Sequence, residues 1–192
     1  MEDDRTKWDN RYTGEGLFLG PKPSTFLVEQ IGLIKSACPG RRAFDIACGE
    51  GRNSIFLSRQ GFSVTGIDIS AAGIAKASKW AKEEHLEIEF IQADLERYEF
   101  DENWDLIINF NFLLRGLLPK AVTALVAGGV MVVDTILDTP SLPGAHTKAF
   151  LLQPGELKGL FASFPGTVLH YEERPLVSAP TAKLVFQKSG NQ

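Results

Sequence analysis

The chain has 192 residues, of which 44% are hydrophobic and 23% charged, and its formal net charge is −4 at pH 7. This length and composition are typical of a soluble globular domain that buries a sizeable apolar core. The acidic balance disfavours a dedicated nucleic-acid surface, because neutralising phosphates requires clustered Lys and Arg side chains. The two cysteines, Cys38 and Cys48, form no CxxC pattern, so neither a disulfide framework nor a metal site is expected.

The hydropathy pattern excludes a membrane-spanning segment. The longest mostly apolar run, residues 125–137, is too short to cross a bilayer and is interrupted by two glycines. The first ten residues are polar and charged and contain no cationic start followed by an apolar stretch. We therefore expect a cytoplasmic protein that is a monomer or a homodimer and has neither a membrane nor a nucleic-acid partner.

Helices and strands are predicted to alternate along most of the chain. After a polar N-terminal segment, apolar residues at helical spacing predict a helix over residues 23–34. Ser70 is a plausible N-cap for a later, Ala- and Lys-rich helix. Strands are predicted at residues 42–48, 63–69, 87–94, 104–111 and 130–136, and helices between them at 53–61, 70–85 and 113–129.

The last third of the chain has a different order. A helix is predicted over residues 154–164, followed by two closely spaced strands at 167–175 and 182–189 that form a hairpin. Repeated strand–helix units predict an α/β fold with a parallel sheet covered on both faces, and the hairpin adds antiparallel character at one edge. We expect a single domain over residues 1–192, in which residues 137–153 form one long loop of the kind that often covers a site.

The chemically informative stretch is a glycine-rich loop directly after the first predicted strand. Gly49 and Gly51 lie where ligands bind in open parallel sheets, at the carboxyl ends of the strands. Glycine lets the backbone turn tightly and lets a ligand approach it closely. The two glycines alone are equally compatible with a dinucleotide, another cofactor or an empty turn. A dinucleotide site prefers a third glycine, at the position where this chain has Ser54.

Three acidic residues near the ends of successive strands narrow the choice of ligand. Asp45 precedes the glycines, where its carboxylate would repel a pyrophosphate but attract an ammonium group. Asp68 ends the second strand and can accept hydrogen bonds from two ribose hydroxyls, and Asp94, at the end of the third strand, can contact an adenine edge. A ligand with ammonium, ribose and adenine parts but no phosphate is S-adenosylmethionine.

Six motifs carry a resemblance to a known family: "KWDNRY" (7–12), "DIACGEGRNSIFLSRQGFSVTGIDIS" (45–70), "IQADLERY" (91–98), "WDLIINF" (104–110), "LVAGGVMVVDT" (125–135) and "AFLLQPGEL" (149–157). Over nearly its whole length the chain resembles the class I S-adenosylmethionine-dependent methyltransferases, and among them the small tellurite-resistance and thiopurine-methyltransferase-like group. The resemblance implies a Rossmann-like three-layer sandwich with a seven-stranded, mostly parallel sheet of order 3-2-1-4-5-7-6, in which strand 7 is antiparallel.

Strand-end positions and the resemblance together define a set of cofactor-binding candidates. An N-terminal segment, residues 1–22, is implied to fold over the cofactor as a lid; the alternative is a surface turn with an exposed Trp8. As an alternative to contacting the cofactor, Asn53 could cap the following helix while Arg52 is exposed to solvent. We interpret Cys48 as a packing residue, because no basic neighbour in the sequence lowers its pKa. The candidates are Asp45, Ala47 (glycine in many relatives), Gly49, Gly51, Arg52, Asn53, Asp68, Ile69, Asp94, Leu95, Asn109 and Phe110, with Trp8, Arg11 and Tyr12 from the lid.

The acceptor side is less well defined by the sequence. Asn111, Phe112 and Arg115 follow the fourth strand, above the expected methyl group, and residues 137–153 are expected to lie over the acceptor. Arg115 and His146 are the only candidates for a catalytic role, and the catalytic residues are otherwise unknown. Since a soft acceptor such as a thiolate needs no general base, we expect methyl transfer to a soft or electron-rich small molecule, with S-adenosylhomocysteine as product.

Two alternative functions are left open by the sequence. A nicotinamide-dependent oxidoreductase uses a similar sheet, and a non-catalytic module could bind S-adenosylmethionine without transferring its methyl group. An Asn-Pro-Pro-Tyr or Asp-Pro-Pro-Tyr motif is absent after the fourth predicted strand, which disfavours methylation of nucleic-acid amino groups.

Overall fold

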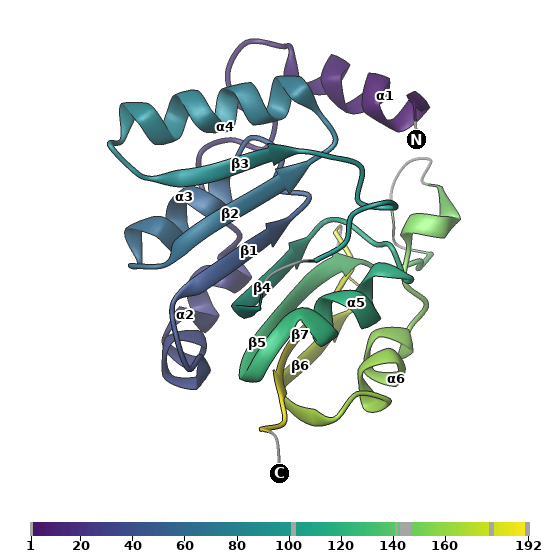
Figure 1. The fold of residues 1–192 in the computed structure, drawn as a ribbon. Helices are drawn as coiled ribbons and strands as arrows, with labels where there is room; N and C mark the ends of the chain where they lie inside the picture. Colours follow the sequence, from purple (N-terminus) through teal and green to yellow (C-terminus); the bar gives the residue numbers. More distant parts are fainter. Residues whose placement is uncertain (1, 101–102, 141, 143–146, 177–178, 191–192) are drawn as a thin grey trace.

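The computed structural model describes residues 2–100, 103–140, 142, 147–176 and 179–190. Its centre is a seven-stranded sheet of order β3-β2-β1-β4-β5-β7-β6 (Figure 1). β7 pairs antiparallel with both of its neighbours, and the remaining pairs are parallel, which confirms the predicted topology. The strands are β1 Arg42–Ile46, β2 Ser63–Asp68, β3 Ile88–Gln92, β4 Trp104–Phe110, β5 Leu125–Ile136, β6 Gly166–Arg174 and β7 Thr181–Lys188.

Helices cover both faces of this sheet and complete a three-layer sandwich (Figure 1). On one face, Phe26, Leu27 and Ile34 of α2 pack against the apolar residues of β4 and β5. On the other face, Phe44 of β1 lies beneath α5 and contacts the Trp104 ring at a centroid distance of 4.9 Å. The helices are α1 Glu2–Tyr12, α2 Thr25–Ala37, α3 Arg52–Arg59, α4 Ala71–Glu83, α5 Leu117–Ala124 and α6 Glu156–Ala162, with a 3-10 turn at Lys148–Phe150.

Two predicted boundaries in the middle of the chain are wrong. The helix expected over residues 113–129 begins only at Leu117, which places Pro119 in its first turn, where a missing N–H costs no hydrogen bond. It ends at Ala124, because Leu125 already pairs with Trp104 as part of β5. The apolar pattern of residues 125–129 is compatible with a helix or with a strand. The pairing of Leu125 with β4 selects the strand.

The N-terminal segment differs most from the prediction, since it contains the regular helix α1. No amphipathic pattern is present in this segment, because Trp8 and Tyr12 are the only large apolar residues between residues 2 and 12. Of the described side chains of α1, Tyr12 alone is buried. The helix lies across the end of α4 (Figure 1), so tertiary contacts rather than its own pattern stabilise it.

The long loop after β5 is closed at its base. Leu137 pairs with Leu152 in an isolated bridge, and the Asp138 N–H donates to the Leu152 carbonyl at 2.8 Å. Part of this loop, including residues 143–146, lies outside the described residues. In the described part of the chain, no helix is long and apolar enough to cross a membrane.

Ser70 caps α4 as predicted, and Gly51 shows how tightly the adjoining loop is packed. The Ser70 hydroxyl oxygen accepts a hydrogen bond from the Gly73 N–H at 3.1 Å. Gly51 precedes α3 with a φ of +84°. A Cβ atom added to it would lie 2.9 Å from the Cβ of Ala77 on α4 and 3.2 Å from the Phe90 ring on β3. The absence of a side chain therefore allows α3, α4 and β3 to approach one another.

We predict that Gly51→Ala destabilises the ligand-free protein more than Gly61→Ala does. Both glycines have positive φ, but an added Cβ at Gly61 meets no atom within 4 Å. Gly61→Ala should cost about 1–2 kcal/mol for the left-handed backbone, and Gly51→Ala about 1–3 kcal/mol more for overpacking. Urea unfolding without ligand measures both values, and equal costs would contradict this packing role.

Candidate functional site

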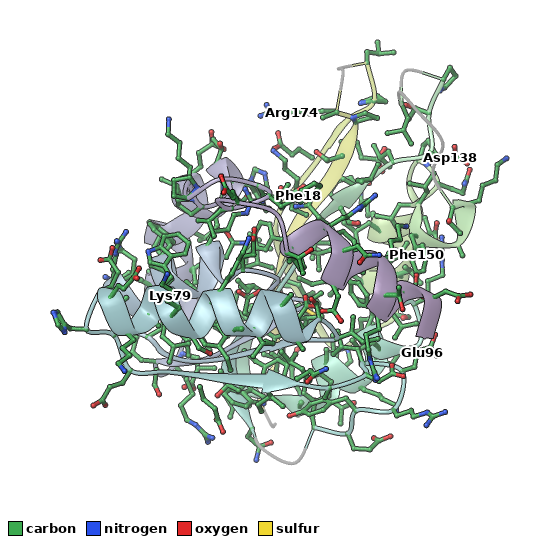
Figure 2. All side chains as sticks on the ribbon, turned by 90° about the horizontal axis from the view of Figure 1, so that it is seen from above. Phe18, Lys79, Glu96, Asp138, Phe150 and Arg174 are labelled. Atoms are coloured by element: carbon green, nitrogen blue, oxygen red, sulfur yellow. The ribbon has the colours of Figure 1, made fainter. Side chains whose placement is uncertain are left out.

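Two adjoining cavities open at the carboxyl ends of β1, β2 and β4. We call the one beside the glycine loop, of about 70 Å³, the loop cavity, and its neighbour, of about 230 Å³, the outer cavity. Figure 2 looks onto this side of the molecule, across which α1 lies. Five residues line both cavities, so one ligand could extend through the two. They are Trp8, Ala47, Asp68, Asn111 and Phe112.

The cavities lie at the topological switch point of the sheet. β1 and β4 are neighbours, and the chain proceeds from them toward opposite edges, which leaves a crevice between their carboxyl ends. Ala47 follows β1 with a φ of +53°, and Asn111 follows β4 with a φ of +55°. Non-glycine residues rarely adopt this conformation, and such residues cluster at functional sites. The Asn111 N–H is fixed by the Asp134 carbonyl at 2.8 Å.

Asp68, at the end of β2, fixes the glycine loop. One of its carboxylate oxygens accepts the Gly49 N–H and the other the Ser70 N–H, each at 2.9 Å. Burial raises the pKa of Asp68, and these backbone hydrogen bonds partly counteract that effect. The backbone N–H of Ile69 is a third group that favours the ionised form. Because Asp68 lines both cavities, its carboxylate can accept hydrogen bonds from hydroxyl groups of a ligand at the boundary.

Asp45 is the most deeply buried acid of the loop cavity. The hydroxyl of Ser54 donates to its carboxylate at 2.6 Å, so the residue in the place of a third glycine is a partner of this acid. Burial raises the pKa of Asp45 to about 7. A cationic group in the loop cavity would therefore stabilise its ionised form.

Asn53, Arg52 and Cys48 also line the loop cavity, and each has a different environment. Asn53 does not cap α3, as one interpretation held; its amide oxygen instead accepts the Ser24 N–H at 2.9 Å. Arg52 also lines the cavity, and burial lowers the pKa of its guanidinium, with Asp45 and Asp134 opposing that effect. Burial raises the pKa of Cys48 well above its usual range, which agrees with a packing role.

The structure brings most of the remaining candidates into the cavities and leaves three out. Ile69 and Leu95 line the outer cavity, and Phe110 lines the loop cavity. Gly51 and Asn109 line neither, and Asn109 is buried with no partner for its amide oxygen.

Asp94 is the third candidate outside the cavities. β3 ends two residues before it, and its carboxylate accepts the Glu96 N–H at 3.0 Å in a tight turn. Since the third strand is shorter than predicted, the expected adenine contact of the Asp94 side chain gains no support from its position.

Of the two catalytic candidates, only Arg115 is described, and it lies outside the cavities. The guanidinium of Arg115 donates to Glu156 and to the carbonyls of Ala149 and Leu151, the last at 2.8 Å, so it secures the end of the long loop. Arg115 lines neither cavity. His146 lies outside the described residues.

The three lid candidates line the cavities. Trp8 lines both cavities, Arg11 the outer one and Tyr12 the loop cavity. The Trp8 and Tyr12 rings stack at a centroid distance of 5.5 Å, and the Arg11 guanidinium lies 4.7 Å from the centre of the Trp8 ring. The N-terminal segment is thus a helical wall of the site.

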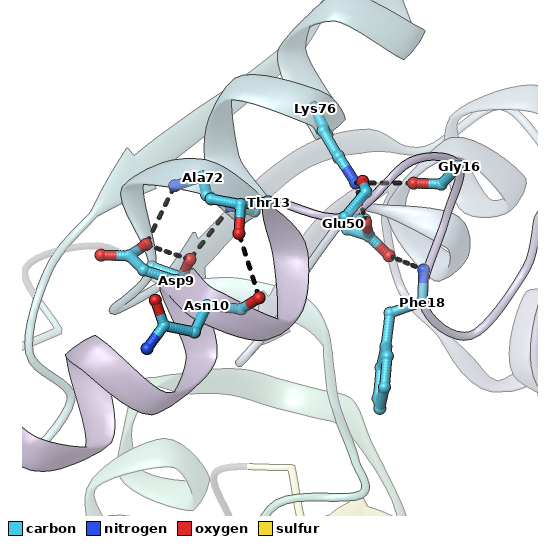
Figure 3. Close-up of polar contacts among 11 residues, drawn as sticks. Asp9, Asn10, Thr13, Gly16, Phe18, Glu50, Ala72 and Lys76 are labelled. Carbon is cyan, nitrogen blue, oxygen red and sulfur yellow. Dashed lines mark hydrogen bonds and ion pairs between the residues drawn. The ribbon is translucent and has the colours of Figure 1, made fainter.

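Three polar residues that hold this wall were not recognised in the sequence (Figure 3). The carboxylate of Asp9 accepts hydrogen bonds from the Ser70 hydroxyl and from the Ala72 N–H. Glu50, between the two loop glycines, forms an ion pair with Lys76 of α4 at 3.0 Å. The one sequence signal for these contacts was the position of Glu50, an acid flanked by two glycines in a buried loop.

The side of the outer cavity away from β2 and β3 is apolar. Its wall consists of Phe112, Leu114, Ile136, Phe150 and Leu151, with Thr147 as a polar member. Phe150 lies near the end of α1 in Figure 2. No cluster of three or more His, Cys, Asp or Glu side chains that could hold a metal ion occurs within the described ranges.

Comparison with known proteins shows what this chain is similar to. Residues 43–129 match a family described as "Methyltransferase domain". The chain is 28% identical over 139 residues to the probable S-adenosyl-L-methionine-dependent methyltransferase TehB of Haemophilus influenzae, covering 69% of this chain and 48% of TehB. Over residues 43–129 the chain is therefore similar to methyltransferase domains, and its sequence similarity to TehB agrees with the predicted resemblance to S-adenosylmethionine-dependent methyltransferases.

A second curated relative and a solved structure are also similar to this chain. The chain is 29% identical over 139 residues to Hemagglutinin 1 of Eikenella corrodens, covering 69% of this chain and 46% of that protein. It therefore spans about half the length of the curated relatives it matches. The structure of magnesium protoporphyrin IX methyltransferase from Synechocystis with bound SAH has a TM-score of 0.76 and 16% identity, covering 98% of this chain and 99% of that one, which confirms the fold.

We predict that Asp45→Asn changes the free energy of unfolding of the ligand-free protein in a pH-dependent way. The change should be more stabilising at pH 8 than at pH 4. With a folded-state pKa raised to about 7, Asp45 contributes stability below its unfolded pKa that is lost as the pH rises through the folded value. Asparagine cannot ionise, so the variant should gain on the order of 3 kcal/mol over the native protein between these two pH values.

Denaturant unfolding of both proteins across this pH range measures the difference. Glu83→Gln, which alters an exposed acid on α4, is the control and should show no comparable dependence on pH. A stability difference for Asp45→Asn that stays constant from pH 4 to pH 8 would show that Asp45 is ionised throughout.

Proposed function

We propose that this chain binds S-adenosylmethionine and transfers its methyl group to a small-molecule acceptor. The observation that carries the proposal is the position of Asp68, whose carboxylate is fixed by the glycine loop at the boundary between the two cavities. Activity is proposed for the region that the chain shares with its relatives, since it spans about half of their length.

The residues present fit the parts of this cofactor. The ammonium group would lie in the loop cavity near Asp45, whose buried carboxylate has Ser54 as its side-chain hydrogen-bond donor. The ribose hydroxyls would meet Asp68, and the adenine would lie in the outer cavity between Ile69 and Leu95. The relative positions of these residues follow the order of the parts in the molecule, from amino acid to base.

The surroundings of the reacting centre favour positioning over acid–base chemistry. A sulfonium cofactor supplies an electrophilic methyl group, so the protein mainly has to orient the acceptor and exclude water. Asn111 and Phe112 line both cavities and would flank the point of transfer, and Trp8 covers it from α1. The described lining of the outer cavity contains no histidine, which supports a soft or electron-rich acceptor that needs no strong base.

The site disfavours the nicotinamide-dependent alternative. A pyrophosphate in the loop would lie beside Asp45, and the third-glycine position is occupied by the buried Ser54 that binds this acid. As further parts of the proposal, the chain acts as one cytoplasmic domain, is a monomer or homodimer and binds no nucleic acid. Its single continuous sheet supports one domain, and its net charge of −4 supports the absence of a nucleic-acid partner.

We predict that the chain binds S-adenosylmethionine and S-adenosylhomocysteine in isothermal titration calorimetry, and that Asp68→Asn weakens both by about 30-fold or more. Asparagine loses the charge and one acceptor site, and hydrogen bonds to charged groups contribute about 1.5–3 kcal/mol each. Glu99→Gln, an exposed acid far from Asp68 in the sequence, is the control and should bind normally. Failure of the native chain to bind either compound would refute the proposal.

Turnover separates the enzyme from a non-catalytic module. The chain is incubated with S-adenosylmethionine and a panel of thiols, phenols and amines, and formation of S-adenosylhomocysteine is followed by mass spectrometry. Transfer to a thiol or phenol is the expected result. Binding without turnover across the whole panel would favour the non-catalytic alternative.

Cofactor affinity should also depend on pH through Asp45. Because burial raises its pKa to about 7, the ammonium of the cofactor must displace a proton from Asp45 in acidic solution. At pH 6 affinity should be roughly ten-fold lower than at pH 8, with release of a proton on binding. Calorimetry in buffers of different ionisation enthalpy measures this proton, and its persistence in Asp45→Asn would assign it to another group.

A further inference from the structure

Glu50 is a buried acid in the glycine loop that the proposed cofactor chemistry does not use. Its side chain is only 6% exposed, although it lies between two glycines. One carboxylate oxygen accepts a hydrogen bond from the Phe18 N–H at 2.6 Å, and the other accepts a hydrogen bond from the Lys76 ammonium at 3.0 Å. Both oxygens therefore face the N-terminal segment and α4, and they connect the cofactor loop to these elements.

Lys76 completes this connection from α4. Its ammonium also donates to the carbonyls of Gly14 and Gly16, at 2.7 and 2.6 Å, so all three of its protons have acceptors. With a side-chain exposure of 27%, it is partly shielded from solvent. A single ammonium thus joins the backbone of residues 14–16 to the acid of the glycine loop (Figure 3).

The N-terminal segment has a second attachment, on the first turn of α4. The carboxylate of Asp9 accepts the Ala72 N–H at 3.1 Å and the hydroxyl of the cap residue Ser70. Between the two attachments lies Tyr12, which packs against the backbone of Gly49 and Gly73. A Cβ added to Gly73 would lie 2.9 Å from the Tyr12 ring.

These contacts matter for cofactor exchange because α1 is a wall of both cavities. Trp8 and Tyr12 would lie against a cofactor that occupies the loop cavity, so movement of this wall would widen the path by which the cofactor leaves. The described part of α1 buries only one side chain, and polar contacts supply most of the remaining attachment. Segments with few buried apolar contacts open locally at low free-energy cost.

We propose that Glu50 and Lys76 are positioning residues that form a latch, holding residues 13–18 and α1 closed over the cofactor site and setting the rate at which the cofactor leaves. This inference rests on the proposed function, since it takes S-adenosylmethionine and its product as the enclosed ligands. The glycine loop then has two roles: its backbone approaches the cofactor, and the side chain between its glycines closes the wall above it.

The test compares Lys76→Met with Lys79→Met. Both lysines lie on α4, and both changes remove one charge with little effect on helix propensity. Lys79 is 77% exposed, pairs only with Glu83 at 3.8 Å and lies away from α1 (Figure 2), so it is a matched control. Glu50→Gln keeps an acceptor for the Phe18 N–H and removes only the charge that faces Lys76.

Two measurements are made on the full chain. Stopped-flow or surface plasmon resonance gives the dissociation rate of S-adenosylhomocysteine, and hydrogen–deuterium exchange gives the protection of residues 8–18 with and without it. Lys76→Met should raise the dissociation rate about ten-fold and speed exchange in this segment, because breaking a shielded charge pair acts mainly on dissociation. Lys79→Met should match the native protein. Adding Glu50→Gln to Lys76→Met should raise the rate little further, since the latch is already broken.

Each outcome has a defined meaning. Dissociation and segment exchange equal to those of Lys79→Met would overturn the latch. Faster exchange over the whole chain, with a lower melting temperature, would also overturn it and assign the pair to general stability. If the native chain binds no S-adenosylhomocysteine, the proposed function fails first, and exchange in the ligand-free variants still shows whether the pair holds residues 13–18.

Discussion

The two backbone hydrogen bonds accepted by Asp68 are the constraint on which the site depends. They join the end of β2 to the glycine loop through Gly49 and to the start of α4 through Ser70. Because the carboxylate is buried, losing either donor would leave a costly unpaired charge. The Asp68 carboxylate, at the carboxyl end of β2, therefore sets the position of the glycine loop relative to α4. Both cavities form around this carboxylate.

The same helix then organises the wall above the site. α4 receives Asp9 at its first turn, and Lys76, further along, holds the segment that follows α1. Since α1 has little apolar surface to bury, its place is decided by these polar contacts and by Tyr12. A site with a wall held mainly by polar contacts would suit the proposed cofactor, which would have to be bound and then exchanged after each turnover.

The buried acids lower the stability of the ligand-free fold. Burial raises the pKa of Asp45 to about 7 and that of Asp134 to about 6, so their ionised forms are disfavoured in the folded chain. A well-packed neutral residue would suit the isolated fold better at Asp45. An acid kept in such surroundings at Asp45 agrees with the proposed ligand, whose cationic amino group would compensate it in the loop cavity.

The sequence by itself determined a parallel sheet with a hairpin at one edge, the loop at the carboxyl end of β1 and the acids Asp45 and Asp68, because strand alternation and residues directly after strands are local features of the chain. The order of the strands was implied by the resemblance to a known family. It did not show that Asp94 is directed into a turn, that residues 125–129 join β5, or that α1 is a helix. Those outcomes depend on where a strand stops pairing and on contacts between distant residues. The connection between Glu50 and Lys76 is of the same kind: each is an ordinary charged residue in the sequence, and only the packing of α4 against the glycine loop shields them together.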